Sequence, residues 1–196
     1  MDVERFEIRL CGSGGQGIIL ASIILAEAAG IIEGYNVSQT QSYGPEARGG
    51  RCRAEVVISS KPIDYPKALQ LDMMLAMNQA SCDAYCYDFK PNGLLLVDSV
   101  LVDQAPTSRV VALPFTEMAR EVAGMDLVAN IVALGALGHF CPLLTRKSLE
   151  AALSARVPEE TRRINRKALQ AGIKAAETFK LDSLPRSIIP DEEEEI

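Results

Sequence analysis

Apolar and polar residues follow two different periods over the first 30 positions of the chain. Residues 5–11 alternate apolar and charged side chains, which is the pattern of a β-strand with one buried face. Residues 15–30 follow the helical period instead, and Gly30 stands where a helix of that length would end. Glycines are concentrated where the two patterns meet. The first 30 residues therefore predict a strand, a tight turn and a helix.

Short apolar runs and helical segments alternate along the rest of the chain. Strands are predicted at 35–41, 52–59, 72–77, 93–99 and 109–115, and helices at 78–89, 116–123, 126–140, 146–153 and 159–179. Strands that alternate with helices favour a parallel sheet with both faces covered. The sequence therefore predicts an α/β fold with three layers: a mostly parallel, Rossmann-like sheet, helices on both of its faces, and a helical C-terminal part.

No repeat and no linker-like segment divides the chain of 196 residues. We therefore expect residues 1–183 to form a single α/β domain. Residues 184–196 contain a run of acidic side chains that repel one another and offer little apolar surface to bury. This segment is predicted to be a flexible acidic tail.

Composition and charge exclude some classes of protein. The net charge of −6 argues against a nucleic-acid-binding protein, which would carry a basic face. No apolar run has the length of a membrane span. The first ten residues lack the apolar core of a secretory signal, and the five cysteines are an odd number. We therefore expect free thiols in a reducing cytoplasm.

Gly12, Gly14 and Gly17 have the G-x-G-x-x-G spacing of a strand-to-helix turn that holds a diphosphate. A dinucleotide site also needs an acidic residue at the end of the second strand, where this sequence has the uncharged segment SQTQSYG. A P-loop needs Lys followed by Ser or Thr, and here Gln16 precedes Gly17 and Ile18. Three alternatives remain: a stand-alone protein that binds NAD or another nucleotide, a turn whose helix amides face an anion, and a tight turn without a ligand.

A second glycine-rich segment, SQTQSYGPEARGG, occupies residues 38–50. Because loops at the carboxyl ends of strands gather at one edge of a sheet, we expect it to lie near the first glycine turn. Arg48, Arg51 and Arg53 form a cationic cluster in an otherwise acidic protein. Such a cluster suits a phosphate, a carboxylate or an acidic partner surface, and a solvated charged loop is the alternative.

The two glycine segments, followed downstream by NIVALGALG at 130–138, occur together at a specific spacing. With GSGGQG and QSYGPEARGG in this arrangement, the chain resembles the gamma subunit of 2-oxoacid:ferredoxin oxidoreductases over about residues 4–180. A short, free-standing gamma chain without a fused ferredoxin domain favours 2-oxoglutarate over pyruvate, branched-chain 2-oxoacids or indolepyruvate. The resemblance implies a subunit of an enzyme that oxidatively decarboxylates a 2-oxoacid onto coenzyme A, with electrons passing to ferredoxin or flavodoxin.

The resemblance also implies how the cofactors are divided among the subunits. In the family, the alpha and beta subunits hold thiamine diphosphate with its magnesium, and the iron–sulfur clusters lie in the beta subunit, a ferredoxin-like delta subunit, or both. The gamma chain helps to form the coenzyme A side of the shared site and has no catalytic residue or metal of its own. The residues expected there are Gly12, Ser13, Gly14, Gly15, Gln16, Gly17, Tyr43, Gly44, Arg48 and Gly49.

The residues themselves agree with this division of labour. The sequence has no Cys-x-x-Cys spacing for an iron–sulfur cluster and no recognisable thiamine motif, so the isolated chain is expected to be inactive. Cys82 and Cys86, four apart on a predicted helix, are expected to line a buried face rather than bind a metal. Asn130 begins a helix in which Gly135 and Gly138 favour close helix packing, with ligand contact as the alternative.

Overall fold

The computed structural model describes residues 3–44 and 50–185, and within them six strands form one sheet in the order β2-β3-β1-β4-β5-β6. The strands are β1 (Phe6–Ser13), β2 (Asn36–Tyr43), β3 (Arg51–Ser59), β4 (Leu71–Ala76), β5 (Phe89–Asp98) and β6 (Val110–Leu113). The helices are α1 (Ile18–Glu27), α2 (Gln79–Tyr85), α3 (Phe115–Ala123), α4 (Ala129–Phe140), α5 (Arg146–Arg156) and α6 (Glu159–Ala176). A π-helical turn follows α1 at Ala28–Ile32, and 3-10 turns lie at Asp126–Val128 and Leu181–Ser183.

The sheet is mostly parallel, as predicted, but its order departs from a Rossmann fold at one place. β1, β4, β5 and β6 pair in parallel, whereas β3 is antiparallel to both β1 and β2. A Rossmann fold places its second strand directly beside the first. Here the β2–β3 hairpin inserts β3 between them, so the end of β2 does not lie next to the end of β1.

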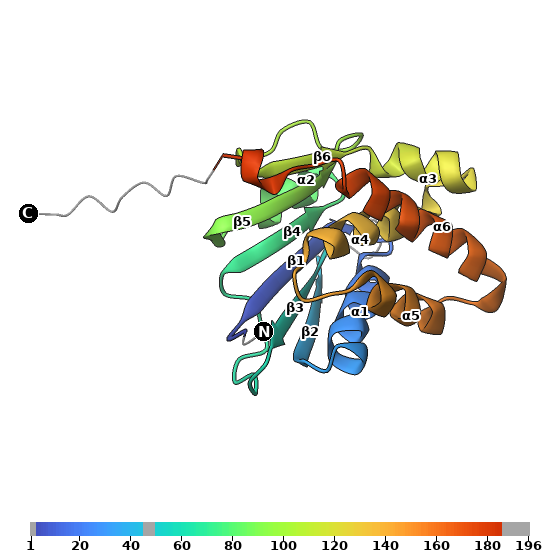
Figure 1. Ribbon diagram of the computed structural model, residues 1–196. Helices are drawn as coiled ribbons and strands as arrows, with labels where there is room; N and C mark the ends of the chain where they lie inside the picture. Colours follow the sequence, from blue (N-terminus) through green and yellow to red (C-terminus); the bar gives the residue numbers. More distant parts are fainter. Residues whose placement is uncertain (1–2, 45–49, 186–196) are drawn as a thin grey trace, which may run out of the picture.

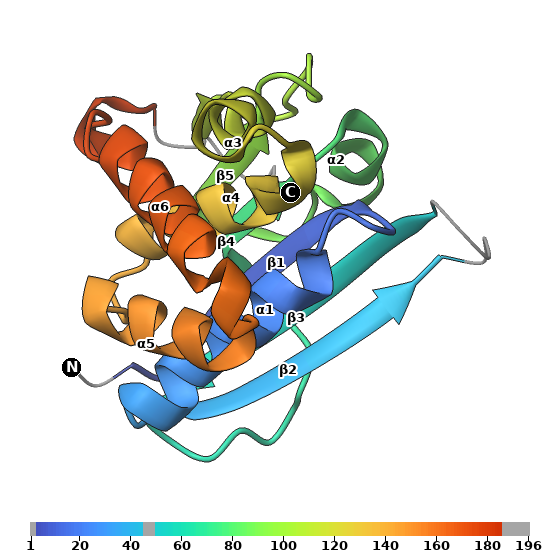
Figure 2. The ribbon, with the colours of Figure 1, turned by 90° about the vertical axis from the view of Figure 1, so that its right-hand side faces the viewer.

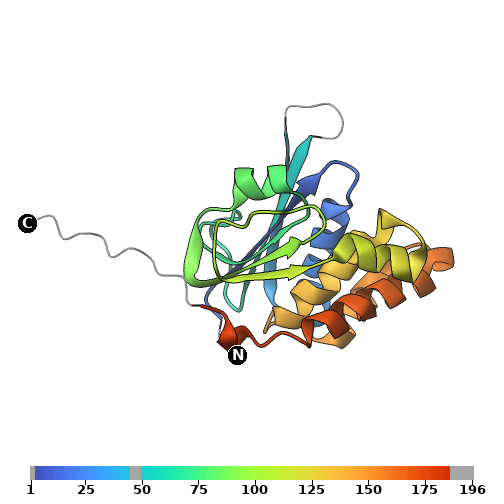
Figure 3. The ribbon, with the colours of Figure 1, turned by 90° about the horizontal axis from the view of Figure 1, so that it is seen from above.

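Helices cover both faces of the sheet, but very unequally. α1, α3, α4, α5 and α6 form one thick layer (Figure 1, and in front of the sheet in Figure 2), and α2 lies on the opposite side (Figure 3). The apolar side chains of β1 divide accordingly: Ile8 and Leu10 belong to the large core under the thick layer, and Cys11 belongs to a smaller core with Cys82 of α2. The predicted three layers are therefore present, with most of the buried apolar surface on one side.

Glycines bring α4 and α6 unusually close, which confirms the predicted close helix packing. A Cβ added to Gly172 of α6 would lie 1.8 Å from the carbonyl oxygen of Val132, and one on Gly135 of α4 would lie 2.2 Å from the carbonyl oxygen of Leu169. A Cβ on Gly138 would meet the side chain of Leu149 at 2.2 Å. No larger residue fits these positions without separating the helices.

The first helix differs from its prediction at both ends. It begins at Ile18 rather than near residue 15, because the preceding residues form the glycine turn. Gly30 does not end it, since the chain continues through the π-helical turn. Gly34, whose φ is +83°, changes the direction of the chain after that turn instead. The sequence contained two glycines four residues apart, and only backbone geometry distinguishes their roles.

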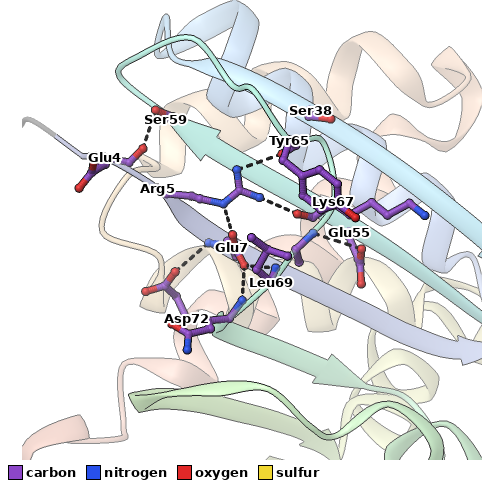
Figure 4. Close-up of polar contacts among 12 residues, drawn as sticks. Glu4, Arg5, Glu7, Ser38, Glu55, Ser59, Tyr65, Lys67, Leu69 and Asp72 are labelled. Atoms are coloured by element: carbon purple, nitrogen blue, oxygen red, sulfur yellow. Dashed lines mark hydrogen bonds and ion pairs between the residues drawn. The ribbon is translucent and has the colours of Figure 1, made fainter.

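A carboxylate at the start of β1 anchors the connection between β3 and β4. Glu7 is buried and accepts hydrogen bonds from the backbone amides of Leu69 and the next residue, both at 2.6 Å. Arg5 pairs with the same carboxylate and donates to the carbonyls of Tyr65 at 3.0 Å and Lys67 at 2.5 Å (Figure 4). This network lies at the amino end of β1, opposite the glycine turn, and holds the connection against the sheet.

The C-terminal part leaves the helical layer beside β6. The carbonyl of Leu184 accepts a hydrogen bond from Arg109 at 3.5 Å, and the Leu184 side chain packs on the large core. The rest of the predicted acidic tail lies outside the described residues, from position 186 onward. Among the helices of the described segments, none combines the length and the apolar character that crossing a membrane requires.

We expect Gly172→Ala to lower the free energy of unfolding by about 2–3 kcal/mol, because the new methyl group meets a backbone carbonyl that cannot move aside. Alanine has a higher helix propensity than glycine by about 1 kcal/mol, so a loss of stability would show that the steric clash outweighs the gain in propensity. Urea denaturation of the purified chain measures it. Lys167→Ala, at an exposed position of the same helix, is the control. A loss no greater than the control's would contradict the close crossing.

Candidate functional site

The glycine turn, defined here as residues 13–17, leaves the carboxyl end of β1 and leads into α1. The Gly14 amide donates to the carbonyl of Gly50 at 2.8 Å, and Ser13 pairs in register with Arg51 of β3. The Gly44 amide closes the hairpin by donating to the Arg51 carbonyl at 2.8 Å. The expectation that the two glycine segments lie together is therefore confirmed.

The side chain of Gln16 holds the glycine turn against the sheet. Its Oε1 accepts from the Ser13 amide at 2.7 Å and from Nδ2 of Asn78 at 3.0 Å, and its Nε2 donates to the Met77 carbonyl at 3.1 Å. Asn78 also donates to the Ser13 hydroxyl at 2.7 Å and caps α2 by accepting from the Ser81 amide at 2.8 Å. Both amide side chains are thus engaged inside the protein, and they join β1, β4 and α2 at the turn.

Two glycines of the motif are required by neighbouring side chains. A Cβ on Gly12 would lie 2.7 Å from Oε1 of Gln16. Gly17 has φ +73°, and a Cβ there would lie 2.3 Å from Nδ2 of Asn130, which donates to the Gly17 carbonyl at 3.1 Å. The turn is therefore clamped on one side by Gln16 and on the other by the first residues of α4. This packing explains Gly12 and Gly17, two of the three motif glycines, without any phosphate.

The turn nevertheless offers free donors at its tip and at the start of α1. The backbone N–H groups of Gly15, Gly17, Ile18, Ile19 and Leu20 donate to no acceptor within residues 3–44 and 50–185. Such groups at a helix N-terminus, together with the helix dipole, favour a negatively charged ligand. Of the turn amides, those of Ser13, Gly14 and Gln16 are already bonded internally.

Two clefts open beside the glycine turn. The strand-end cleft, of about 370 Å³, lies at the carboxyl ends of β4, β5 and β6 and is lined by Gln16, Met77, Leu101, Thr116 and Arg120 among others. The helix cleft, of about 600 Å³, lies between the starts of α1, α4 and α6 and is lined by Gly17, Leu20, Met125, Leu127, Asn130 and Ile164 among others. Gly15 and Leu127 border both clefts. The tip of the turn therefore faces two cavities of ligand size.

The predicted hairpin residues lie at the other side of the turn. Tyr43 ends β2, is 65% exposed and pairs with Cys52, which in turn pairs with Gly12 of β1. Arg48 and Gly49 lie outside the described residues. Arg53 is not free to join a cluster there, because it donates to the Tyr87 hydroxyl at 2.9 Å and lies over the Tyr85 ring on the α2 side.

Asp98 is a polar residue at this edge of the sheet that the sequence analysis missed. It ends β5, is fully buried, and accepts from the amide and hydroxyl of Thr116 at 3.1 and 2.5 Å and from the Val100 amide at 3.1 Å. Burial raises the pKa of its carboxyl, and these hydrogen bonds only partly oppose the rise. Asp98 thus fixes the start of α3 and the segment after β5, both of which border the strand-end cleft. The only feature of the sequence that could have indicated this role is that Asp98 is an acidic residue near the end of a predicted strand.

The thiols next to the turn form no metal site. Burial raises the pKa of the Cys11 thiol, and a hydrogen bond between Cys86 and Cys82 raises the pKa of Cys86 while it lowers that of Cys82. Throughout the part of the chain that the structure describes, no three His, Cys, Asp or Glu side chains are placed to hold a metal ion. All five cysteines are free.

Comparison with known proteins identifies the family to which this chain belongs. The chain belongs to the pyruvate ferredoxin/flavodoxin oxidoreductase family, which it matches over residues 7–175. The 2-oxoglutarate synthase subunit KorC of Methanocaldococcus jannaschii is 45% identical over 176 residues, which are 88% of this chain and 94% of that protein. The resemblance seen in the two glycine segments is therefore confirmed.

Two solved structures share the fold. The gamma subunit of a keto/oxoacid ferredoxin oxidoreductase from Geobacter sulfurreducens matches with a TM-score of 0.79 at 43% identity, over 89% of this chain and 99% of that one. The 2-oxoglutarate:ferredoxin oxidoreductase from Magnetococcus marinus, with 2-oxoglutarate, coenzyme A and succinyl-CoA bound, matches with a TM-score of 0.78 at 26% identity. That match covers 90% of this chain and 32% of the other, where the domain is part of a longer polypeptide.

Gly17→Ala is expected to destabilise the chain more than Gly15→Ala. Both positions have positive φ and share a backbone strain of about 1–3 kcal/mol, but only the Gly17 substitution also collides with Asn130. We expect an additional loss of about 1–3 kcal/mol for Gly17→Ala, measured by urea denaturation. Equal losses for the two variants would show that the Asn130 clamp does not restrict the turn.

Asp98→Asn is expected to change how stability depends on pH. The folded-state pKa of Asp98 is raised, so its contribution is complete below the unfolded pKa of about 3.9 and is lost as pH rises through the folded value. The stability of the wild type relative to Asp98→Asn should therefore fall as pH rises from about 4. Unfolding free energies measured across this range check it, with the exposed Asp103→Asn as a control for net charge. If the free energy of unfolding of the wild type relative to Asp98→Asn rises with pH instead, the pKa of Asp98 is lowered in the folded state rather than raised.

Proposed function

We propose that this chain is the gamma subunit of a 2-oxoglutarate:ferredoxin oxidoreductase, and that its glycine turn forms part of the coenzyme A side of a shared active site. Enzymes of this class decarboxylate a 2-oxoacid oxidatively, transfer the acyl group to the thiol of coenzyme A and pass the electrons to an acceptor such as ferredoxin. The name of the KorC relative and the 2-oxoglutarate, coenzyme A and succinyl-CoA in the Magnetococcus structure support the choice of substrate.

The observation that carries the proposal is that, within the described residues, the amides of Gly15, Gly17, Ile18, Ile19 and Leu20 are unpaired and lie beside two clefts. Coenzyme A combines phosphate groups with a long, less polar arm. The amides and the α1 dipole suit its phosphates, and the strand-end cleft beside the turn offers room for the rest of the molecule. In this proposal the backbone amides bind the phosphates without a lysine or a bound metal.

The predicted site residues divide into three roles under this proposal. Gly15 and Gly17 present backbone amides to the ligand, and Gly12 leaves room for the clamp of Gln16. Ser13, Gly14 and Gln16 hold the turn in place, since their amides or side chains are bonded internally. We assign Tyr43, Gly44, Arg48 and Gly49 to the hairpin side, where they would face coenzyme A or a neighbouring subunit.

The remaining chemistry belongs to partner subunits. Within the described residues, the donor set includes no group of side chains for magnesium, and the five cysteines do not gather as the ligands of an iron–sulfur cluster. The described residues therefore supply no ligands for the magnesium that accompanies thiamine diphosphate or for a cluster. We assign these cofactors to alpha and beta subunits and a ferredoxin-like delta subunit, with ferredoxin or flavodoxin as the acceptor. Five free thiols suit a reducing cytoplasm.

A stand-alone NAD-binding protein is the less favoured alternative. β3 separates the end of β2 from the glycine turn, and β2 ends in Gln41, Ser42 and Tyr43 without an acidic residue for the ribose hydroxyls. The geometry thus lacks the group that a dinucleotide site uses to fix its adenosine half.

The test is a pair of substitutions at the tip of the turn in the purified complex. Gly15→Asp and Gly15→Asn impose the same backbone strain at φ +98° and enter open space, but only Asp adds a negative charge. We expect the KM for coenzyme A to be about tenfold higher for Asp than for Asn, because the carboxylate repels the phosphates. The assay is viologen reduction that depends on coenzyme A.

The KM for 2-oxoglutarate serves as the internal control and should be the same in both variants. The wild-type complex should also prefer 2-oxoglutarate over pyruvate, 2-oxoisovalerate and indolepyruvate in kcat/KM. If Asp and Asn give equal KM values for coenzyme A, the turn does not face its phosphates, and the purely architectural role of the glycines is the better account.

A further inference from the structure

Large aliphatic side chains stand exposed around the helix cleft. Leu127 is 72% exposed, Met125 48% and Leu20 37%, and all three line the cleft of about 600 Å³. They come from the start of α1 and from the segment around the 3-10 turn Asp126–Val128, two parts of the chain more than 100 residues apart. Exposed aliphatic groups gathered around an apolar cavity are typical of an interaction site rather than of an ordinary surface.

A buried polar atom at the base of the same cleft has no partner. Asn130 is 4% exposed, and its Nδ2 donates to the Gly17 carbonyl at 3.1 Å. Its Oδ1 is buried and accepts no hydrogen bond from any described residue. A buried acceptor without a donor is costly, so an occupant that supplies an N–H group gains a hydrogen bond there. The cleft therefore fits an apolar segment that carries an N–H donor.

The length of the Magnetococcus relative indicates what this occupant is. This domain accounts for 32% of that polypeptide, so the remainder is joined to it covalently. The present chain matches that domain over 90% of its length. The KorC relative is named a subunit and is matched over 94% of its length, so the part that corresponds to the remainder lies on another chain there. If the proposed function holds, the present chain likewise binds that part as a separate subunit, through a surface that a tether would otherwise support.

We propose that the helix cleft and its rim are the docking surface for the subunit that corresponds to the remainder of this longer polypeptide. An apolar segment of that subunit packs against Leu20, Met125 and Leu127, and one of its N–H groups bonds to Oδ1 of Asn130. Glu160 and Arg163, both exposed beside the cleft, give it a polar border of both signs, as is usual at protein interfaces. This inference rests on the proposed function.

The position of the cleft gives the interface a second consequence. Gly15 and Gly17 belong both to the helix cleft and to the glycine turn. A subunit docked in the cleft therefore covers one side of the turn and excludes water from the amides at its tip. Binding of the partner and completion of the coenzyme A site are then the same event.

The experiment uses the chain produced together with its partner subunits and purified through a tag on this chain. Leu127→Asp is expected to raise the dissociation constant for the partner subunit at least tenfold, because a carboxylate replaces a central apolar contact. The ratio of the subunits after size-exclusion chromatography measures it. Ile31→Asp is the matched control, since Ile31 is 77% exposed and lies on the π-helical turn, outside the cleft. It should assemble as the wild type does.

A second variant distinguishes a lost interface from a misfolded chain. Met125→Asp changes a different exposed side chain of the same rim, and circular dichroism of each purified chain verifies the fold. Loss of assembly in both cleft variants but not in Ile31→Asp supports the docking surface. Equal loss in all three would overturn it. Intact assembly with a raised KM for coenzyme A would overturn it too, because the cleft would then hold the ligand itself.

Failure of the docking surface is distinguishable from failure of the proposed function. If the wild-type chain forms an active complex that depends on coenzyme A while Leu127→Asp assembles normally, only the surface is wrong. If the wild-type chain forms no complex with subunits that bear thiamine diphosphate and iron–sulfur clusters, the proposed function fails, and the docking inference fails with it.

Discussion

The register between β1 and β3 is the constraint on which the rest of the site depends. Arg9 and Glu55 face each other across these strands, and the Arg9 guanidinium donates to the buried carboxylate at 3.0 Å and to the Tyr85 carbonyl at 2.9 Å. A slip of β3 by one residue would move Glu55 into the large apolar core and leave Arg9 buried without its partner. The observed register places Gly50 beside Gly14, and so brings the hairpin to the glycine turn.

The turn itself is held before any ligand arrives. Gln16 ties it to β4 and α2, and Asn130 ties it to α4. A ligand that binds the amides of a turn already fixed in this way does not have to order the backbone first, which preserves affinity. Under the proposed function, the chain supplies a rigid edge that faces an anion and leaves the reacting groups to other subunits. This division suits an enzyme in which oxidation, acyl transfer and electron transfer use separate cofactors.

Local patterns predicted most of the elements, because apolar periodicity reports which face of a strand or helix is buried. They could not predict that β3 runs antiparallel between β1 and β2, since strand order depends on pairing between distant segments. The site shows the same division. The glycine spacing located the turn, but the contacts of Gln16 with Asn78, and of Gly17 with Asn130, join residues 62 and 113 positions apart. The burial of Asp98 likewise depends on the start of α3, which follows the later strand β6.

Two hydrogen bonds hold the β2–β3 hairpin next to its connecting residues. The Gly44 amide donates to the Arg51 carbonyl within the hairpin, and the Gly14 amide of the glycine turn donates to the Gly50 carbonyl. Both bonds lie on the sheet side of the connecting residues. Insertions or deletions within that connection therefore leave the strand register and the glycine turn unchanged. During evolution, a change of length at this single place is therefore expected to have little effect on the folding of the domain.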